Sequence, residues 1–315
     1  MRETLHEQIA ANKRASAFYA FLIVLLLAAM GTAIAGSVEP DFWWAGTAGA
    51  TGLGLIVALV ARVAGPGIVL SVSGAREANP QEDRVLRNVG EEMAIAAGMP
   101  MPKLYVIDDS APNAFATGTD PKNGVVCFTS GLINKLNRDE LQGVMAHEMA
   151  HIRNYDIRLM TTLAMVAGLI PLLADMFWRF LRGGGGRKSK NDQAQIIFLV
   201  FAVVLSILAP LFAKLLEMAV SRQREFLADA TAAHMTRYPE GLASALEKIS
   251  HDHDVLEAAN RATQHMYIVN PFKPIEDRAK SLFSTHPPLE QRVFRLRGIM
   301  GQRDAEAVEP PRPVA

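Results

Sequence analysis

Long uncharged apolar runs alternate along this chain with segments of globular pattern. The first run, Ala17 to Gly36, contains no charge and at ~1.5 Å per residue can cross a ~30 Å hydrocarbon core. The second run, Phe42 to Val63, begins with Trp43 and Trp44, residue types that favour the membrane interface. The pattern predicts two transmembrane helices in an N-terminal hairpin over residues 1–63. A cleaved signal peptide is the alternative for the first run, but its apolar region is usually shorter.

Charges around the two runs indicate their orientation. The connection between the runs contains Glu39 and Asp41 but no basic residue, whereas basic residues precede the first run: Arg2, Lys13 and Arg14. Lys and Arg are enriched on the cytoplasmic side of membrane helices. We therefore expect the N-terminus, and residues 64–158 after the hairpin, to lie in the cytoplasm.

Residues 64–158 have the pattern of the first half of a globular domain. A helix is predicted over residues 82–97, ending at Gly98, and another begins near Asn137 or Asp139. Two runs of strand-forming residues lie between these helices: 103–107 and 125–129. The expected fold is mainly α with a small β-sheet.

Residues 159–220 contain two further apolar runs, which predict a second apolar helical hairpin. Charged residues and prolines interrupt both runs, so the hairpin either spans the membrane or is a buried helical pair of a soluble domain. Its basic connection argues against a double crossing, because it would lie outside the cell.

The chain after residue 220 returns to a globular pattern. Helices are predicted over residues 238–250 and 286–299, within a second half of the soluble domain at 221–300. Residues 301–315 are rich in proline and charge, so we expect a disordered tail.

Composition supports a membrane protein with a soluble portion. Of the 315 residues 50% are hydrophobic and only 20% are charged, which is unusually apolar for a soluble domain of this size. Basic and acidic residues number 32 each, so the charge balance does not indicate a nucleic-acid partner. The single cysteine, Cys127, excludes an intramolecular disulfide.

The motif with most chemical content is His-Glu-x-x-His at residues 147–151, in a predicted helix. Residues four apart on a helix differ in direction by about 40°, so His147 and His151 can bind one ion. Zinc suits imidazole nitrogen, and catalytic zinc sites keep a position for water. Glu148 could act on that water as general base. The motif therefore predicts one Zn²⁺ per chain and a hydrolytic reaction.

A catalytic zinc site needs a third protein ligand, and the stretch SRQREFLADA at 221–230 offers one. Glu225 would complete a site of two histidines and one glutamate. Asp229, one turn further on, could accept the remaining N–H of a ligand histidine and fix its tautomer. By itself, this Glu-x3-Asp spacing is also common on solvated helix faces.

The two N-terminal runs, HEMAH, the second apolar hairpin and SRQREFLADA together resemble the HtpX group of membrane zinc metalloproteases, heat-shock proteases related to the CAAX endopeptidase Ste24. The resemblance covers nearly the whole chain. It implies a membrane-anchored, gluzincin-like metallopeptidase of the zincin type, with Glu225 as third zinc ligand and Asp229 behind the ligands. It also implies that His286 and Arg292 face the cleft, with His286 stabilising the developing oxyanion.

Two further features carry over from the resemblance. Asn113, in PNAFATG, could hydrogen-bond the substrate backbone, and a local role in a turn is the alternative. The strand at 125–129 resembles the active-site edge strand of the family, to which an extended substrate would add as a further strand. Such pairing reads the backbone, so sequence selectivity should be loose.

The implied function is a zinc endopeptidase of the bacterial cytoplasmic (inner) membrane, multi-pass, with its active site on the cytoplasmic side. Its expected partners are polypeptide substrates, especially misfolded or unassembled membrane proteins, and the lipid bilayer, but no nucleic acid. Two alternatives are an inactive membrane scaffold and a zinc hydrolase of a non-peptide bond. A scaffold would be expected to lack a motif residue, and none is missing.

Overall fold

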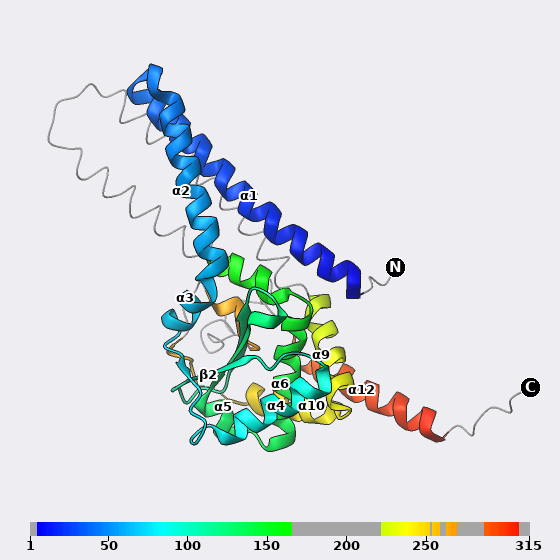
Figure 1. Cartoon of the computed structure of the whole chain (residues 1–315). Helices are drawn as coiled ribbons and strands as arrows, with labels where there is room; N and C mark the ends of the chain where they lie inside the picture. The colour runs from blue at the N-terminus through cyan, green and yellow to red at the C-terminus, as the bar shows by residue number, and fades with distance from the viewer. Residues whose placement is uncertain (1–4, 166–221, 253, 259–262, 270–286, 309–315) are drawn as a thin grey trace, which may run out of the picture. The chain divides into compact units, whose positions relative to one another are not determined.

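The structure is a computed structural model that describes residues 5–165, 222–252, 254–258, 263–269 and 287–308 (Figure 1). The chain divides into two compact units, which are described separately. The first is formed by Met1–Val69 and Arg158–Ala219, and the second by Leu70–Ile157 and Val220–Ala315.

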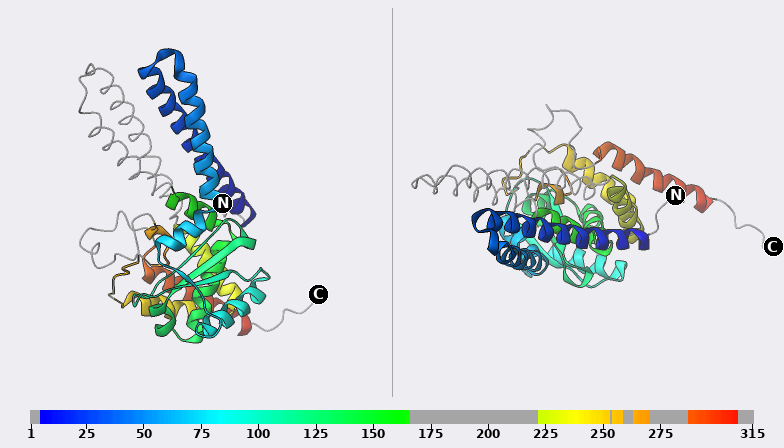
Figure 2. Two further views of the ribbon diagram at one scale, coloured as in Figure 1. Left: turned by 60° about the vertical axis from the view of Figure 1, so that its left-hand side comes forward. Right: turned by 90° about the horizontal axis from the view of Figure 1, so that it is seen from above.

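The first unit contains the N-terminal hairpin. Helices α1 (Leu5–Val38) and α2 (Trp43–Val63) are joined by a short 3-10 turn, η1 (Pro40–Phe42), and lie side by side near this connection (Figures 1 and 2). A Cβ at Gly31 would lie 2.5 Å from the carbonyl oxygen of Gly46, so both positions require glycine. Such close approach of small residues is common where membrane helices pack.

Both helices are long and apolar enough to cross a membrane, as the sequence predicted. The candidate spans are Ile9–Ala29 and Trp43–Val63, each of 21 residues. Large apolar side chains on α2 are exposed, among them Ile56 at 59% and Leu59 at 61%. Exposure of such a surface to water is unfavourable at ~25 cal/mol per Å², whereas contact with lipid carries no such cost. Residues 156–165 are also helical, but residues 166–220 of the predicted second hairpin lie outside the described part of the chain.

The second unit contains a mixed four-stranded sheet in the order β1-β2-β4-β3. Strands β2 and β4 are parallel, and β1 and β3 pair antiparallel with them. The strand bounds are β1 Arg76–Glu77, β2 Lys103–Ile107, β3 Ala114–Gly118 and β4 Gly124–Thr129. The strands predicted from sequence are β2 and β4.

The predicted edge position of β4 is wrong. Strand β4 pairs on both sides, with β2 and β3, so β3 is the edge strand on this side of the sheet. Strand β3 has no polar alternation because all five of its residues are buried, and Asn113 before the strand and Gly118 at its end favour a turn. The sequence pattern therefore concealed β3.

The remaining elements of the described residues are mainly helical, which confirms the predicted mainly α fold with a small sheet. Helix α4 ends at Gly98, whose φ of 62° is readily adopted only by glycine. The last helix continues to Val308, so residues 301–308 are not the disordered tail expected; it ends before Glu309-Pro310, where proline disfavours helix in the preceding residue. The bounds are α3 Gly65–Val72, α4 Arg84–Ala97, η2 Pro121–Asn123, α5 Ser130–Lys135, α6 Arg138–Arg153, α9 Arg222–Thr236, α10 Pro239–Ser250, η3 Gln264–Met266 and α12 Leu289–Val308.

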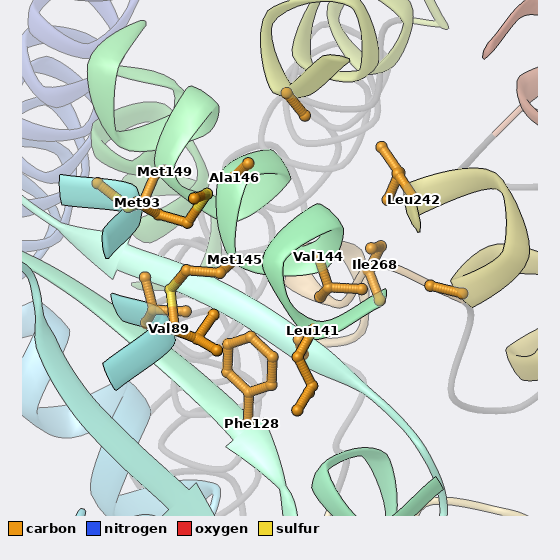
Figure 3. Close-up of a cluster of buried hydrophobic side chains, with 14 of the residues drawn as sticks. Val89, Met93, Phe128, Leu141, Val144, Met145, Ala146, Met149, Leu242 and Ile268 are labelled. Carbon is orange, nitrogen blue, oxygen red and sulfur yellow. The ribbon is translucent and has the colours of Figure 1, made fainter. Parts of the chain in front are cut away.

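Helix α6 is the centre of the second unit. Figure 3 shows Leu141 and Met145 of α6 beside Phe128 of β4, and Val144 on the side of Leu242 from α10. The helix begins with a capping box, in which the side chains of Asn137 and Glu140 each accept from the other residue's backbone N–H. The residues from Glu140 to Ile152 are buried apart from Gln142, so α6 is held from every side.

Candidate metal centre

The two histidines of the motif lie on one face of α6, as their spacing predicted. Their Nε2 atoms are 3.2 Å apart, and the rings are perpendicular with centroids 4.7 Å apart. His147 is 1% exposed and His151 4%. The pair therefore offers two nitrogen atoms to one enclosed point.

Helix α9 brings Glu225 to the same point. Its Oε2 lies 3.7 Å from Nε2 of His147, and its Oε1 lies 3.6 Å from Nε2 of His151. One donor atom from each of the three residues lies within 4.8 Å of the other two. Small residues on the buried face of α9, Ala228 and Ala232, let the two helices approach closely. The three side chains could thus hold a metal ion.

Each histidine also faces a carboxylate through its other ring nitrogen. Nδ1 of His147 is 3.0 Å from Oδ1 of Asp229, and Nδ1 of His151 is 2.9 Å from Oδ2 of Asp156. A carboxylate accepts hydrogen bonds, so each Nδ1 carries a proton and donates it. Both Nε2 lone pairs then point at each other across 3.2 Å, an arrangement that repels unless a proton or cation lies between them. The donor set fits zinc, because both Nε2 lone pairs face one point while each Nδ1 donates to a carboxylate.

The pKa shifts of the two histidines follow from these neighbours. Burial lowers the pKa of His151, but Asp156 and Glu225 outweigh it and raise the value. Burial and the Arg292 charge lower the pKa of His147, despite the hydrogen bond to Asp229. The two pKa values therefore shift in opposite directions, because carboxylates dominate the surroundings of His151 while the positive charge of Arg292 lies beside His147.

Sequence reasoning missed Asp156. Helix α6 ends at Arg153, and Tyr155 adopts a left-handed backbone with φ 60° before the chain becomes helical again at Asp156. A left-handed non-glycine residue costs about 1–2 kcal/mol. Helical periodicity would direct Asp156 away from His151, so only a prediction of the turn at Asn154 and Tyr155 could have revealed it.

Glu148 lies beside the cluster and is 1% exposed. Burial, reinforced by the charge of Glu225, raises the pKa of Glu148 to about 7, against the opposing effects of His151 and Arg292. The backbone N–H of Ala116, on edge strand β3, donates to this carboxylate. A carboxylate with a pKa near neutrality is suited to accept and release protons.

Arg292 of α12 is fully buried behind the ligand residues. Its Nη2 lies 2.7 Å from Oδ1 of Asp229 and its Nε 2.9 Å from Oδ2, a bidentate pair. Its Nη1 is 3.3 Å from Oε2 of Glu225. Arg292 Nη2 also lies 3.4 Å from both ring nitrogens of His147, and its Nη1 contacts the backbone carbonyl of Ile268. Arg292 therefore lies at the site, and a contact with substrate stays a prediction.

The charges at the centre favour a divalent cation. The carboxylates of Glu148, Asp156, Glu225 and Asp229 are all buried, and in the described part of the chain the guanidinium groups of Arg292 and Arg224 lie close to members of this group. Unbalanced buried charge is strongly unfavourable. A divalent cation at this point would add positive charge where buried carboxylates outnumber guanidinium groups among the described residues.

Two predicted site residues remain, Asn113 and His286, and the structure describes only the first of them. The side-chain amide of Asn113 is buried and contacts the chain itself, donating from Nδ2 to the carbonyl of Val269 at 3.0 Å. This contact joins segments 156 residues apart, so it differs from the local turn role that the sequence left as the alternative, and a substrate contact stays a prediction. His286 lies outside the described residues.

Part of the β3 edge is covered by a following segment. Phe115 forms an isolated β-bridge with Tyr267, and the N–H of Ile268 donates to the carbonyl of Ala114 at 2.9 Å. The rings of Phe115 and Tyr267 meet edge to face at 5.1 Å. The uncovered part of the β3 edge, which lies beside Glu148, therefore begins at Ala116.

The buried centre and the two candidate spans define a class, the membrane-associated metalloproteases. Residues 80–300 match Peptidase family M48. A "Protease HtpX homolog" of Caldanaerobacter subterraneus subsp. tengcongensis is 46% identical and covers 95% of this chain and 99% of its own length. One of Dictyoglomus thermophilum is 47% identical, covering 95% and 96%.

A solved structure shares the fold. The crystal structure of S. mikatae Ste24p matches with a TM-score of 0.50 at 19% identity, over 91% of this chain and 66% of that chain. The chain belongs to peptidase family M48, and its resemblance to the HtpX group is confirmed.

Proposed function

We propose that the chain is a zinc-dependent endopeptidase of the bacterial cytoplasmic membrane. It cleaves misfolded or unassembled membrane proteins and unfolded polypeptides, with its active site on the cytoplasmic side. The observation that carries the proposal is the convergence of His147, His151 and Glu225, from two helices, beside a carboxylate whose pKa is about 7.

The three converging residues would hold one Zn²⁺, with Asp229 supporting His147. When bound, zinc polarises the scissile carbonyl and lowers the pKa of water toward ~7. Two imidazoles and one carboxylate are a known set of protein ligands in catalytic zinc sites.

Glu148 is the general base. Its carboxylate takes a proton from the attacking water and delivers it to the leaving amine, and a pKa near 7 serves both transfers. The N–H of Ala116 orients the carboxylate toward strand β3. His286 is proposed as the donor to the developing oxyanion, and Arg292 and Asn113 as groups near the substrate path.

Strand β3 is the proposed docking edge for substrate. An extended peptide would add antiparallel or parallel to its edge from Ala116 onward, within reach of Glu148. Backbone pairing is independent of side-chain identity, which suits an enzyme for unfolded segments of many sequences. A folded substrate would have no free strand to offer.

The membrane role rests on the hairpin α1–α2 and on the charge asymmetry around it. Residues on the expected cytoplasmic side include Lys13 and Arg14, and the connection contains only acidic charges. An enzyme anchored in this way meets membrane proteins at high local concentration. The relatives named as HtpX proteases support the same role.

Casein digestion by detergent-purified full-length protein tests the function. We expect cleavage that a chelator stops and zinc restores. The Glu148→Gln variant should keep its zinc and lose activity by about 10²–10⁴-fold, the contribution of general base catalysis. Glu91→Gln, an exposed glutamate on α4, is the matched control and should cleave normally.

Three outcomes would contradict the proposal. An active Glu148→Gln variant would remove the assigned base. Zinc-loaded wild-type protein that leaves casein intact but hydrolyses a simple ester would indicate a non-peptide hydrolase. Protein that binds no zinc and cleaves nothing would indicate a membrane scaffold.

A further inference from the structure

We propose that Asp156 is a positioning residue of the metal centre, which holds His151 in the tautomer that leaves Nε2 free to bind metal. The inference rests on the proposed zinc site. It assigns a role to a side chain that lies five positions beyond the second histidine of the motif, outside both sequence elements that define the site.

The contact between Asp156 and His151 is short and enclosed. Oδ2 of Asp156 lies 2.9 Å from Nδ1 of His151, and Asp156 is 0% exposed. An acceptor-only carboxylate at this distance requires the proton on Nδ1. The Nε2 lone pair of His151 then points toward His147 and Glu225, where the metal would bind.

The backbone is shaped to make this contact. In a continued α6, a residue five positions after His151 would project about 140° away from it. The helix instead ends at Arg153, and the left-handed φ of 60° at Tyr155 redirects the chain. Strained residues persist where the surrounding structure requires them, commonly at functional sites.

The contact also repeats an arrangement on the other histidine. Asp229 accepts from His147 and is paired with Arg292, while Asp156 accepts from His151 and has Nε of Arg224 at 3.6 Å from its Oδ1. Helix α9 therefore supplies the ligand Glu225, the aspartate behind His147 and the arginine beside Asp156, whereas the arginine beside Asp229 comes from α12. Each histidine is thus backed by its own aspartate and arginine.

Two substitutions separate positioning from simple packing. Asp156→Ala removes the acceptor, so the tautomer of His151 is no longer imposed. In Asp156→Asn, Arg224 favours the amide oxygen on its own side, and the amide N–H₂ then faces His151. This moves the ring proton to Nε2, where it opposes metal binding, so the more conservative variant should be at least as damaging.

The experiment measures zinc affinity of the full-length protein in detergent by competition with a chromophoric chelator. We expect both variants to bind zinc about 10–100-fold more weakly, the usual effect of losing a partner of a metal-binding histidine. In saturating zinc, kcat on casein should fall while KM stays unchanged, because Asp156 lies behind the ligand. Asp139→Asn and Asp139→Ala, at an exposed aspartate of α6, are the controls and should match wild type.

The outcomes distinguish this inference from the function on which it rests. If the wild type binds zinc and the Asp156→Asn variant binds it equally tightly, Asp156 has no positioning role. A variant with a lowered Tm but wild-type zinc affinity leads to the same conclusion, since the carboxylate is then only structural. If Asp156→Ala does not fold, Asp156→Asn decides the question alone. A wild type without zinc contradicts the proposed function instead.

Discussion

Buried acidic side chains surround the metal centre, and each one faces a positive or hydrogen-bonding partner. Asp229 has the bidentate Arg292 pair, and burial, which raises the pKa of Asp229, is outweighed by Arg292 and His147, so its pKa lies below the usual range. Glu148 has no such pair among its described neighbours and its pKa is raised instead. The difference separates a permanently charged supporting residue from one able to exchange protons.

At the residue scale, Glu225 provides a direct prediction about the metal. The Glu225→Ala variant should bind zinc more weakly than wild type by a factor larger than the ~10–100-fold expected for a residue behind the ligands. The reason is that a ligand atom itself is removed. Metal content of the purified protein after dialysis measures this, with Glu91→Ala as the exposed control. Unchanged metal content in the Glu225→Ala variant would mean that the third ligand lies elsewhere.

At the scale of the elements, α6 depends on close contacts with its neighbours. A Cβ on Gly143 would lie 2.5 Å from the backbone nitrogen of Leu242, at the start of α10. Gly241 meets α6 in the same way, with a Cβ 2.6 Å from the carbonyl oxygen of Asp139. Backbone atoms cannot move aside as a flexible side chain would, so these glycines determine how closely the two helices pack.

The Gly143→Ala substitution should therefore destabilise the protein by about 1–3 kcal/mol, the usual cost of an overpacked core. Gly298→Ala is the control, because a Cβ at this exposed α12 position would meet no described atom within 4 Å. That control should be neutral or more stable by about 0.5–1 kcal/mol, since alanine favours helix. Thermal unfolding of both variants in detergent gives the comparison, and an equal Tm for the two would contradict the close packing.

At the scale of the whole molecule, an apolar hairpin and a peptidase unit occupy one chain. The only cysteine, Cys127, is 0% exposed, and burial raises the pKa of its thiol, so it is shielded from thiol reagents. The chain therefore offers an unreactive background for introduced cysteines. Accessibility of such cysteines reports the side of the membrane on which each part lies.

The Glu39→Cys variant should react with a membrane-impermeant maleimide in intact cells, because the connection between α1 and α2 is expected outside. The Lys122→Cys variant, at an exposed position of η2, should react only after permeabilisation. Wild-type protein is the control and should stay unlabelled. The reverse pattern would place the peptidase unit on the outer side.

Much of this protein could be predicted from local sequence because the relevant physics is local. Helical spacing places His147 and His151 on one face, apolar length predicts α1 and α2, and strand-forming runs predict β2 and β4. Strand β3 escaped prediction because its burial on both faces removes the polar alternation that reveals a strand. The family resemblance indicated Glu225, which spacing alone left ambiguous.

Sequence alone determined the long helices, strands β2 and β4, the His-Glu-x-x-His motif and the two candidate membrane spans, since each depends on residues close together in the chain. Tertiary structure alone decided that β3, and not β4, forms the sheet edge, because edge position depends on which strands pair. It alone also decided that Asp156 reaches His151 through the turn at Tyr155, and that Arg292 contacts both Glu225 and Asp229. Contacts of this kind depend on backbone breaks and helix packing, which local periodicity does not encode.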